Sequence, residues 1–123
     1  MPGGTVYFNE LNTWNPEDAK AFYGDVLGWT FQEVPTGDGQ TYILARSGDA
    51  LAGGIFTYTS PMFDGAQEFW LTYFAVDDID ARCEAAKANG AHVRRAPFDV
   101  PGFGRIAVLD DPAGATLAFI QPA

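Results

Sequence analysis

The sequence predicts an α+β fold built from two βαβββ modules within one domain. The first observation is an internal repeat with an offset of 62 residues, which aligns Asp18 with Asp80 and Gly28 with Gly90. Most of the repeated residues fall where helices begin or end and where the chain turns, and backbone conformation restricts the residue type there. The second observation is that each half carries one strand pattern, one amphipathic helix pattern and three further strand patterns. Two such sheets can bury both faces if they curve around a shared interior with the helices outside.

In the first module, strand-forming residues fill Thr5–Leu11. Asn15 is typical of a helix N-cap, with Pro16 at the first helical position, and Gly28 ends the helix as a left-handed residue. The apolar face expected on this helix consists of Ala19, Phe22, Tyr23, Val26 and Leu27. Three strands are expected to follow, over Trp29–Val34, Gln40–Arg46 and Ala52–Thr59.

The second module repeats this order after a linker. Residues 61–66 are small, polar or turn-forming, so they are expected to join modules 1–60 and 67–123 of a single domain that covers 1–123. A strand is expected over Glu68–Val76, and a helix capped by Asp77 or Asp78 ends before Gly90. Strands are then expected over 92–97, 105–109 and 115–120, with a loop over 99–104.

Composition narrows the possible partners of the chain. Sixteen acidic residues against seven Lys and Arg give a net charge of −9, which repels phosphate backbones and makes nucleic acid an unexpected partner. Cys83 is the single cysteine of the sequence, so an internal disulfide is excluded. The sequence has neither a leader pattern nor an apolar run of about 18 residues. We therefore expect a cytoplasmic protein that does not enter a membrane.

Three motifs in order resemble a known superfamily. They are Ala21–Trp29, Phe74–Asp80, and Gly104-Arg105 followed by Asp111–Ala115. With the internal repeat, they resemble the vicinal oxygen chelate superfamily, the glyoxalase, bleomycin-resistance and extradiol-dioxygenase group. The resemblance implies paired βαβββ modules that form a cupped, incomplete barrel. It also implies a divalent metal inside the cup, held by His or Glu from the first and last strands of each module, and often a homodimer.

The four metal-ligand positions of that superfamily fall on residues that cannot bind a metal. Counting from the motifs places them on Phe8 and Phe56 in the first module and on Trp70 and Ala118 in the second. A catalytic metal needs about three His, Asp, Glu or Cys ligands. We therefore expect no metal site and no cofactor. The resemblance instead implies an aromatic-lined cup that binds a small, partly aromatic or hydrophobic molecule.

Polar residues near these positions are the remaining candidates. Glu10 lies two residues after Phe8 and so points to the same side of the strand. It is a candidate general base or a counter-ion for a cationic ligand, and equally a structural partner of Arg105 or of a backbone amide. Four side chains could donate to a ligand in the pocket or equally belong to the strand core or edge: Tyr42, Tyr58, Tyr73 and Thr72. Arg105 could bind a carboxylate or enolate oxygen of a ligand, or form a surface ion pair.

Two alternatives stay open at this point. One is a metal-dependent, glyoxalase-like lyase or isomerase, or a dioxygenase, which requires a shifted site in which Glu10 and Glu68 hold Mg²⁺ or Mn²⁺ with waters. The other is a metal-free enzyme with Glu10 as the catalytic base. In each case the expected partners are a small-molecule ligand and a second copy of the chain. The dimer is implied mainly by the resemblance to the superfamily, and it would cover the sheet edges and the apolar face that a cupped barrel leaves.

Overall fold

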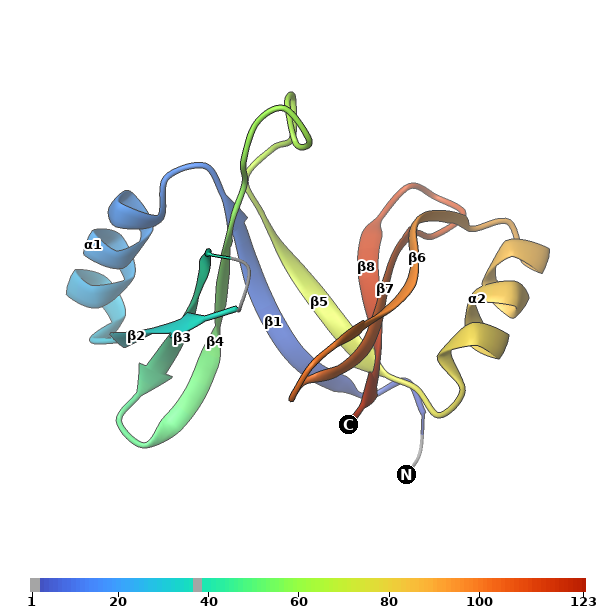
Figure 1. Ribbon diagram of the computed structural model, residues 1–123, viewed down its shortest axis with the longest axis horizontal. Helices are drawn as coiled ribbons and strands as arrows, with labels where there is room; N and C mark the ends of the chain where they lie inside the picture. Colours follow the sequence, from blue (N-terminus) through green and yellow to red (C-terminus); the bar gives the residue numbers. More distant parts are fainter. Residues whose placement is uncertain (1–2, 37–38) are drawn as a thin grey trace. The chain divides into compact units, whose positions relative to one another are not determined.

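The computed structural model describes residues 3–36 and 39–123. Figure 1 traces the chain as one strand, one helix and three strands, followed by the same order again. The elements are β1 (Val6–Thr13), α1 (Pro16–Leu27), β2 (Thr30–Pro35), β3 (Thr41–Ser47), β4 (Ala50–Thr57), β5 (Phe69–Ala75), α2 (Ile79–Ala88), β6 (His92–Val100), β7 (Gly104–Asp110) and β8 (Thr116–Pro122). The predicted α+β class and the repeated βαβββ order are therefore confirmed.

The chain forms two compact units. One unit is Asn9–Trp70, and the other is Leu71–Ala123 together with the segment that ends at Phe8. Strand β1 contributes to both units, since its residues up to Phe8 belong to one and those from Asn9 onward belong to the other.

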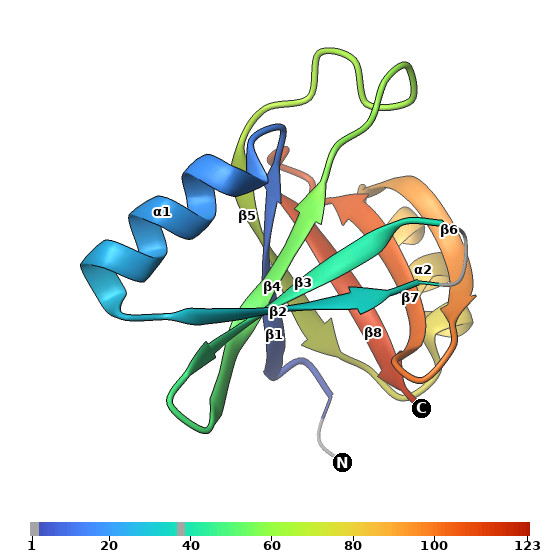
Figure 2. The same cartoon turned by 60° about the vertical axis from the view of Figure 1, so that its left-hand side comes forward.

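In the unit Asn9–Trp70, the strands follow the order β2-β3-β4-β1, which Figure 2 shows from a second side. Strand β1 is parallel to β4, and the other neighbours are antiparallel. The core between the sheet and α1 consists of Leu11, Ala19, Ile43 and Ile55, with Tyr23 and Phe31 packed against it. Residues Leu11, Ile43 and Ile55 therefore mark the helix side of this sheet.

Helix α1 meets its sheet through a narrower stripe than the sequence predicts. Ala19 is buried and Tyr23 is half-buried. Phe22, Val26 and Leu27, which were expected on the same buried face, are 57%, 62% and 53% exposed. The physical reason is geometric, because a single helix crossing a sheet covers only the residues along its line of contact.

In the other unit, the strands follow the order β5-β8-β7-β6, with β5 parallel to β8. Its core under α2 consists of Val76, Ile79, Cys83 and Ala107, with Val93 and Phe119 packed against it. Burial raises the pKa of the Cys83 thiol, with a smaller contribution from Asp80. Cys83 therefore acts as a small core residue and not as a reactive thiolate.

The helix ends follow the local chemistry of the sequence. Gly28 ends α1 in the left-handed conformation with φ of 74°, and Gly90 follows α2 with φ of 93°. At the start of α2, Ala81 N–H donates to Asp78 Oδ1 at 3.2 Å. Asn15 takes the N-cap position of α1, but its side chain makes no capping bond among the described contacts.

The expected loop over 99–104 is shorter in the structure. Strand β6 continues to Val100 and β7 begins at Gly104, so that Asp99 pairs with Arg105 in the ladder. The antiparallel pairing holds up to the turn, where Gly102 adopts a positive φ of 79°. Strand β6 lies at the end of its strand order and has two register shifts, and the one between Arg95 and Phe98 spans Pro97.

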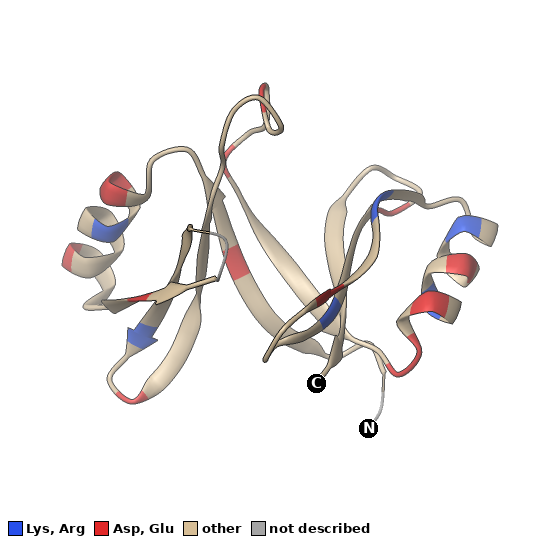
Figure 3. Cartoon of the chain, viewed as in Figure 1, with Lys and Arg blue, Asp and Glu red and all other residues tan. Residues whose placement is uncertain are grey.

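Within residues 3–36 and 39–123, the helices are too short and too polar to cross a membrane. Both helices carry acidic and basic residues together (Figure 3).

Candidate functional site

Glu10 lies on β1 in the unit Asn9–Trp70 and is only 6% exposed. The Tyr42 hydroxyl donates to Glu10 Oε1 at 2.7 Å, and Asn12 Nδ2 donates to Glu10 Oε2 at 3.2 Å. The same Asn12 amide also donates to the Glu10 backbone carbonyl at 3.2 Å. A buried carboxylate is costly unless donors satisfy it, and these two neutral donors orient both of its oxygens.

Gly54 explains how Tyr42 reaches Glu10. Tyr42 is on β3 and Glu10 is on β1, with β4 between the two strands. Gly54 of β4 stands opposite Glu10 in the parallel register. A Cβ atom at Gly54 would lie 2.0 Å from the Tyr42 hydroxyl oxygen. The missing side chain therefore leaves the space through which the phenol ring passes over β4.

Aromatic rings continue the same side of the sheet. Phe56 lies two residues after Gly54 and opposite Asn12, so it shares that side. Its ring centroid is 6.1 Å from that of Tyr58 and 5.3 Å from that of Phe63. We call the surface formed by Glu10, Asn12, Tyr42, Phe56 and Tyr58 the Glu10 face.

Tyr58 is 6% exposed and donates its hydroxyl to the Gln67 carbonyl at 2.8 Å. Burial raises the pKa of Tyr58, and the negative charges of Glu68 and Glu10 raise it further. Tyr58 therefore remains a neutral phenol at physiological pH, next to two carboxylates.

Glu68 has a structural role in this unit. Its carboxylate accepts the Trp14 backbone N–H at 2.7 Å and the Thr13 hydroxyl. Trp14 in turn donates its indole N–H to the Ala66 carbonyl at 2.9 Å. These bonds fasten the segment before β5 to the chain between β1 and α1.

Trp70 lies on the opposite side of this sheet from Glu10. Its indole Nε1 donates to the Tyr23 hydroxyl of α1 at 3.0 Å, and it is 37% exposed. A Cβ atom at Gly53 would lie 3.6 Å from the Trp70 ring, whereas a Cβ at Gly54 would meet Tyr42. Consecutive strand residues point to opposite sides of a sheet. Within this unit, Trp70 thus packs on the helix side, contrary to the expectation that it would share an inward surface with Glu10.

Three further candidates lie in the other unit. Phe8 is 7% exposed, with its ring 6.0 Å from Tyr73 and 5.6 Å from Phe103 in edge-to-face contacts. Ala118 is completely buried and pairs with Tyr73. Thr72 is half-buried, and by strand alternation it points away from the side that carries Tyr73. A ligand-binding role for these residues stays a prediction.

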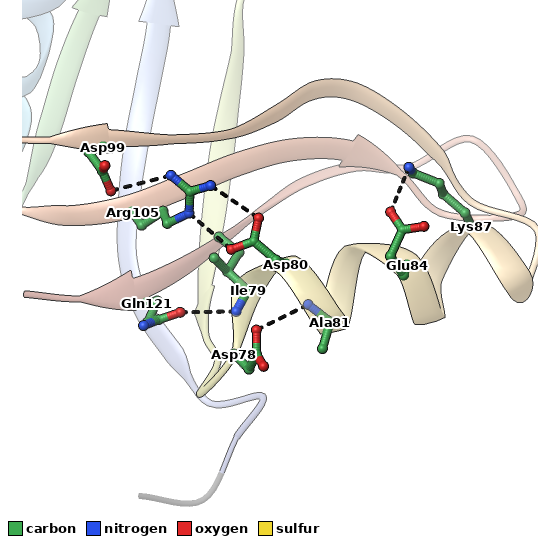
Figure 4. Close-up of polar contacts among 9 residues, drawn as sticks. All are labelled: Asp78, Ile79, Asp80, Ala81, Glu84, Lys87, Asp99, Arg105 and Gln121. Carbon is green, nitrogen blue, oxygen red and sulfur yellow. Dashed lines mark hydrogen bonds and ion pairs between the residues drawn. The ribbon is translucent and has the colours of Figure 1, made fainter.

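Arg105 is held by two carboxylates of its own unit (Figure 4). Its Nη2 and Nε atoms bond both oxygens of Asp80 at 3.0 and 3.1 Å, and Nη1 lies 3.4 Å from Asp99 Oδ1. The bond from Arg105 holds the pKa of Asp80 below its usual range. Arg105 also lines a pocket of about 310 Å³ at the β6–β7 turn and the end of β8. A ligand carboxylate there would have to compete with Asp80.

The donor set does not fit the divalent metal that the superfamily implies. The positions to which counting from the motifs assigns the ligands carry Phe8, Phe56, Trp70 and Ala118. Residues 3–36 and 39–123 contain no group of three or more His, Cys, Asp and Glu side chains that could hold a metal ion. Hard cations require several oxygen ligands, and this part of the chain does not bring such a set together.

Sequence reasoning did not find the importance of Gly54 and Asn12 for Glu10. Glycine inside a strand pattern signals a close approach by another group, and the pair Gly53-Gly54 is such a signal. What approaches it depends on the strand order, which residue spacing does not specify.

Comparison with known proteins supports this fold and places the chain among its relatives. The sequence profile of the Glyoxalase/Bleomycin resistance protein/Dioxygenase superfamily matches residues 6–119. A Mycobacterium tuberculosis protein named "Putative glyoxylase CFP32" is 42% identical over 120 residues, which are 98% of this chain and 45% of that protein. The anthracycline biosynthesis protein DnrV of Streptomyces peucetius is 31% identical over 95% of this chain and 46% of its own length.

This chain thus spans about half the length of the curated relatives that it matches first. Among solved structures, Streptomyces coelicolor methylmalonyl-CoA epimerase has a TM-score of 0.69 at 15% identity, covering 99% of both chains. That similarity establishes the fold. The profile match over nearly the whole sequence shows that the chain belongs to the Glyoxalase/Bleomycin resistance protein/Dioxygenase superfamily.

Proposed function

We propose that this chain binds a small, partly aromatic or hydrophobic molecule on the Glu10 face, without the divalent metal of its superfamily. The observation that carries the proposal is the oriented, 6% exposed Glu10 carboxylate beside the rings of Phe56 and Tyr58. Ligand sites are mostly apolar, with a few polar groups at set positions. The Glu10 face has this composition.

The name of one relative is compatible with such a ligand. One of them is named for the biosynthesis of anthracyclines, which are polycyclic aromatic compounds. Flat aromatic molecules pack well against phenyl and phenol rings. The activity and substrates of the whole relatives, which are about twice as long, enter here only as an indication of ligand class.

A metal-free enzyme is the second candidate. A buried carboxylate held at both oxygens by neutral donors can serve as a general base if a substrate proton comes within hydrogen-bonding distance. The same Glu10 contacts favour this candidate. It differs from the binding proposal in requiring turnover.

We also propose a cytoplasmic homodimer. Phe22 and Val26 of α1 expose more than half of their surface, and such apolar groups are commonly covered by a partner subunit. Size-exclusion chromatography with light scattering tests this point. A mass of one chain across the micromolar range would contradict it.

The proposal that the chain holds no divalent metal is tested by elemental analysis of protein purified without chelator, together with a melting curve in EDTA. We expect substoichiometric metal and an unchanged Tm. One metal ion per chain, with a large decrease of Tm in EDTA, would overturn the proposal in favour of a metal-dependent lyase, isomerase or dioxygenase.

The binding part is tested with a library of small aromatic and aliphatic metabolites, read by thermal shift and tryptophan fluorescence. Trp14 reports on the face directly, because its ring lies 5.2 Å from that of Tyr58. We expect aromatic hits whose binding is weakened by Glu10→Gln and Phe56→Leu, and not by Glu33→Gln on the exposed edge strand β2. Hits insensitive to both face variants would contradict the location. Turnover of a hit that disappears in Glu10→Gln would select the enzyme candidate.

A further inference from the structure

We propose that Phe63 occupies the aromatic part of the Glu10 face in the free chain, and that a ligand binds there by taking the place of this ring. This inference rests on the proposed function and deepens it by naming the residue that controls access to the site. Its basis is the contacts among Phe56, Tyr58 and Phe63, all of which belong to the unit Asn9–Trp70.

Phe63 contacts both rings that the proposed ligand would use. Its ring centroid lies 5.3 Å from that of Phe56, with an interplanar angle of 75°, and 5.3 Å from that of Tyr58, with an angle of 43°. Phe56 and Phe63 are each half-buried, whereas Tyr58 is 6% exposed. A ligand ring would make contacts of the same edge-to-face or tilted kind. Phe63 therefore competes from within the chain for the aromatic surface that a ligand needs.

Phe63 is carried by residues 59–66, which we call the strap and which lie between β4 and β5. Hydrogen bonds fix the chain at both ends of the strap. On one side, the Tyr58 backbone N–H donates to the Thr13 carbonyl at 2.8 Å. On the other, the Trp14 indole N–H donates to the Ala66 carbonyl at 2.9 Å. The movement that we propose is therefore confined to the middle of the strap.

The middle of the strap forms a turn whose hydrogen bonds join residues of the strap to one another. The Ser60 hydroxyl donates to Asp64 Oδ1 at 2.6 Å, and the Phe63 N–H donates to the Thr59 carbonyl at 3.1 Å. Met62, the neighbour of Phe63, is 77% exposed. Segments with exposed side chains and a small buried surface are those that open locally at low cost. The turn can therefore swing as one piece and carry Phe63 away without breaking these bonds.

The strength of the ring contacts sets how strongly Phe63 opposes binding. A single aromatic pair changes an equilibrium by about two- to tenfold. A ligand that displaces Phe63 loses this factor, because the contacts of Phe63 must be broken first. Removal of the Phe63 ring should therefore increase the affinity by a factor of this size. A ring that formed a wall of the site would have the opposite effect, since its removal would weaken binding.

The test uses 2-naphthalenemethanol, a neutral probe with two fused rings, titrated into the full chain and into its variants by calorimetry and ligand-observed NMR. We expect Phe63→Ala to bind the probe about two- to tenfold more tightly than the parent protein. Its Tm should be lower, because the ring contacts are lost. Phe63→Leu keeps an apolar side chain and should give a smaller increase in affinity, so the test does not depend on the folding of the alanine variant.

A second measurement needs no variant. In the free, isotope-labelled chain, NOEs should connect the ring protons of Phe63 with those of Phe56. Saturation with the probe should remove these NOEs and replace them with NOEs between the naphthalene protons and Phe56. This exchange distinguishes displacement of Phe63 from a ligand that packs beside it.

Two matched controls accompany the Phe63 variants. Met62→Ala removes an apolar side chain of the same strap that is 77% exposed, and Phe22→Ala removes a phenylalanine of α1 that is 57% exposed. Both variants should bind the probe as the parent protein does.

Several results would overturn the inference while the proposed function stands. They are unchanged or weaker binding by the Phe63 variants, NOEs between Phe56 and Phe63 that persist in the saturated complex, and an equal gain of affinity in Met62→Ala. The proposed function would fail in a different way. If the probe bound neither the parent protein nor Phe63→Ala, or bound Phe56→Leu as tightly as the parent, the site would not lie on the Glu10 face, and the inference would fall with it.

Discussion

At the residue scale, two glycines of the same unit show how the surrounding atoms decide whether a position can carry a side chain. Gly54 lies in β4 under the Tyr42 ring, and its Cβ position is 2.0 Å from the phenol oxygen. Gly24 lies inside α1, and its Cβ position has only ordinary contacts, 3.6 Å from the Trp29 carbonyl and 3.7 Å from the Phe31 ring. The same substitution at these two positions should have opposite effects.

We predict that Gly54→Ala lowers the free energy of unfolding by about 1–3 kcal/mol, because the new methyl group displaces a ring packed against a rigid strand. Gly24→Ala should raise it by about 0.5–1 kcal/mol, because alanine restricts the unfolded chain and favours helix. Urea denaturation of both variants measures the two values. A neutral Gly54→Ala would show that Tyr42 is not packed over β4.

The other residue-scale lesson concerns Trp70. Counting from the motifs placed it at the position equivalent to Phe8, yet its ring packs on Tyr23 and Trp29, with centroids 5.5 and 6.1 Å away. Aromatic side chains gain similar burial on either side of a sheet. The side that a Trp takes is therefore decided by the space available, which here is the surface beside Gly53.

At the scale of elements, the two helices begin with different N-caps. Asp78 accepts the Ala81 N–H at 3.2 Å, whereas the Asn15 N–H instead donates to the Thr13 hydroxyl at 2.9 Å. Both residues occupy the position that the sequence predicts for a cap. Their contributions to stability should nevertheless differ.

We predict that Asp78→Ala costs about 1 kcal/mol of stability, because it leaves a helix N–H without its acceptor. Asn15→Ala should cost only a few tenths of that amount, since no capping bond is lost. Thermal or urea unfolding of the pair provides the comparison, with each variant serving as the control for the other. Equal losses would mean that Asn15 caps α1 in solution.

Asp110 of β7 bonds to side chains of both neighbouring strands, β8 and β6, in the unit that contains Leu71–Ala123. The Thr116 hydroxyl of β8 donates to its Oδ1 at 2.6 Å, and Arg94 Nε of β6 lies 2.7 Å from its Oδ2. The bond from Thr116, and then the interaction with Arg94, lowers the pKa of Asp110. A lowered carboxyl pKa stabilises the fold above the unfolded-state pKa, and this contribution is lost as the pH falls through the folded-state value.

We therefore predict that Thr116→Val raises the pKa of Asp110 toward its ordinary value. The variant should be less stable near pH 7 and should lose less stability than the parent between about pH 5 and pH 2. NMR titration of the Asp110 carboxyl and urea denaturation across this range test both points. Thr116→Ser keeps a hydroxyl and is the control. If the stability of Thr116→Val and of the parent protein changed with pH in parallel, the bond from Thr116 would not be what lowers the pKa of Asp110.

At the scale of the whole molecule, the dominant electrostatic feature is the excess of 16 acidic over 7 basic residues. The ion pairs between exposed side chains, such as Lys87 with Glu84 at 2.7 Å, are of the kind that contribute little in water. Repulsion among the unpaired carboxylates should therefore determine how the stability responds to salt.

We predict that Tm rises when NaCl increases from about 10 mM to about 300 mM near pH 8, because salt screens this repulsion within a Debye length of roughly 6–30 Å. The increase should vanish near pH 4.2, the isoelectric point of the sequence. Calorimetry at both NaCl concentrations, in one buffer near pH 8 and one near pH 4.2, measures these changes in Tm. A Tm that falls with salt near pH 8 would mean that attractive ion pairs outweigh the net charge.

The sequence by itself determined the features that depend on neighbours along the chain. Gly28 and Gly90 end the two helices because only glycine adopts a positive φ at little cost, and the βαβββ order follows from local periodicity. It also determined that Phe8 and Phe56 carry no metal donor, whatever their surroundings.

The tertiary structure alone decided which of the polar residues work together. Tyr42 and Glu10 are 32 residues apart in sequence, and they meet because β4 lies between their strands with a glycine at the crossing point. Arg105 meets Asp80 and Asp99 because β6 pairs with β7 up to the turn. Contacts across a sheet depend on strand order and register, and these are set by how all the strands pack together and not by any single segment.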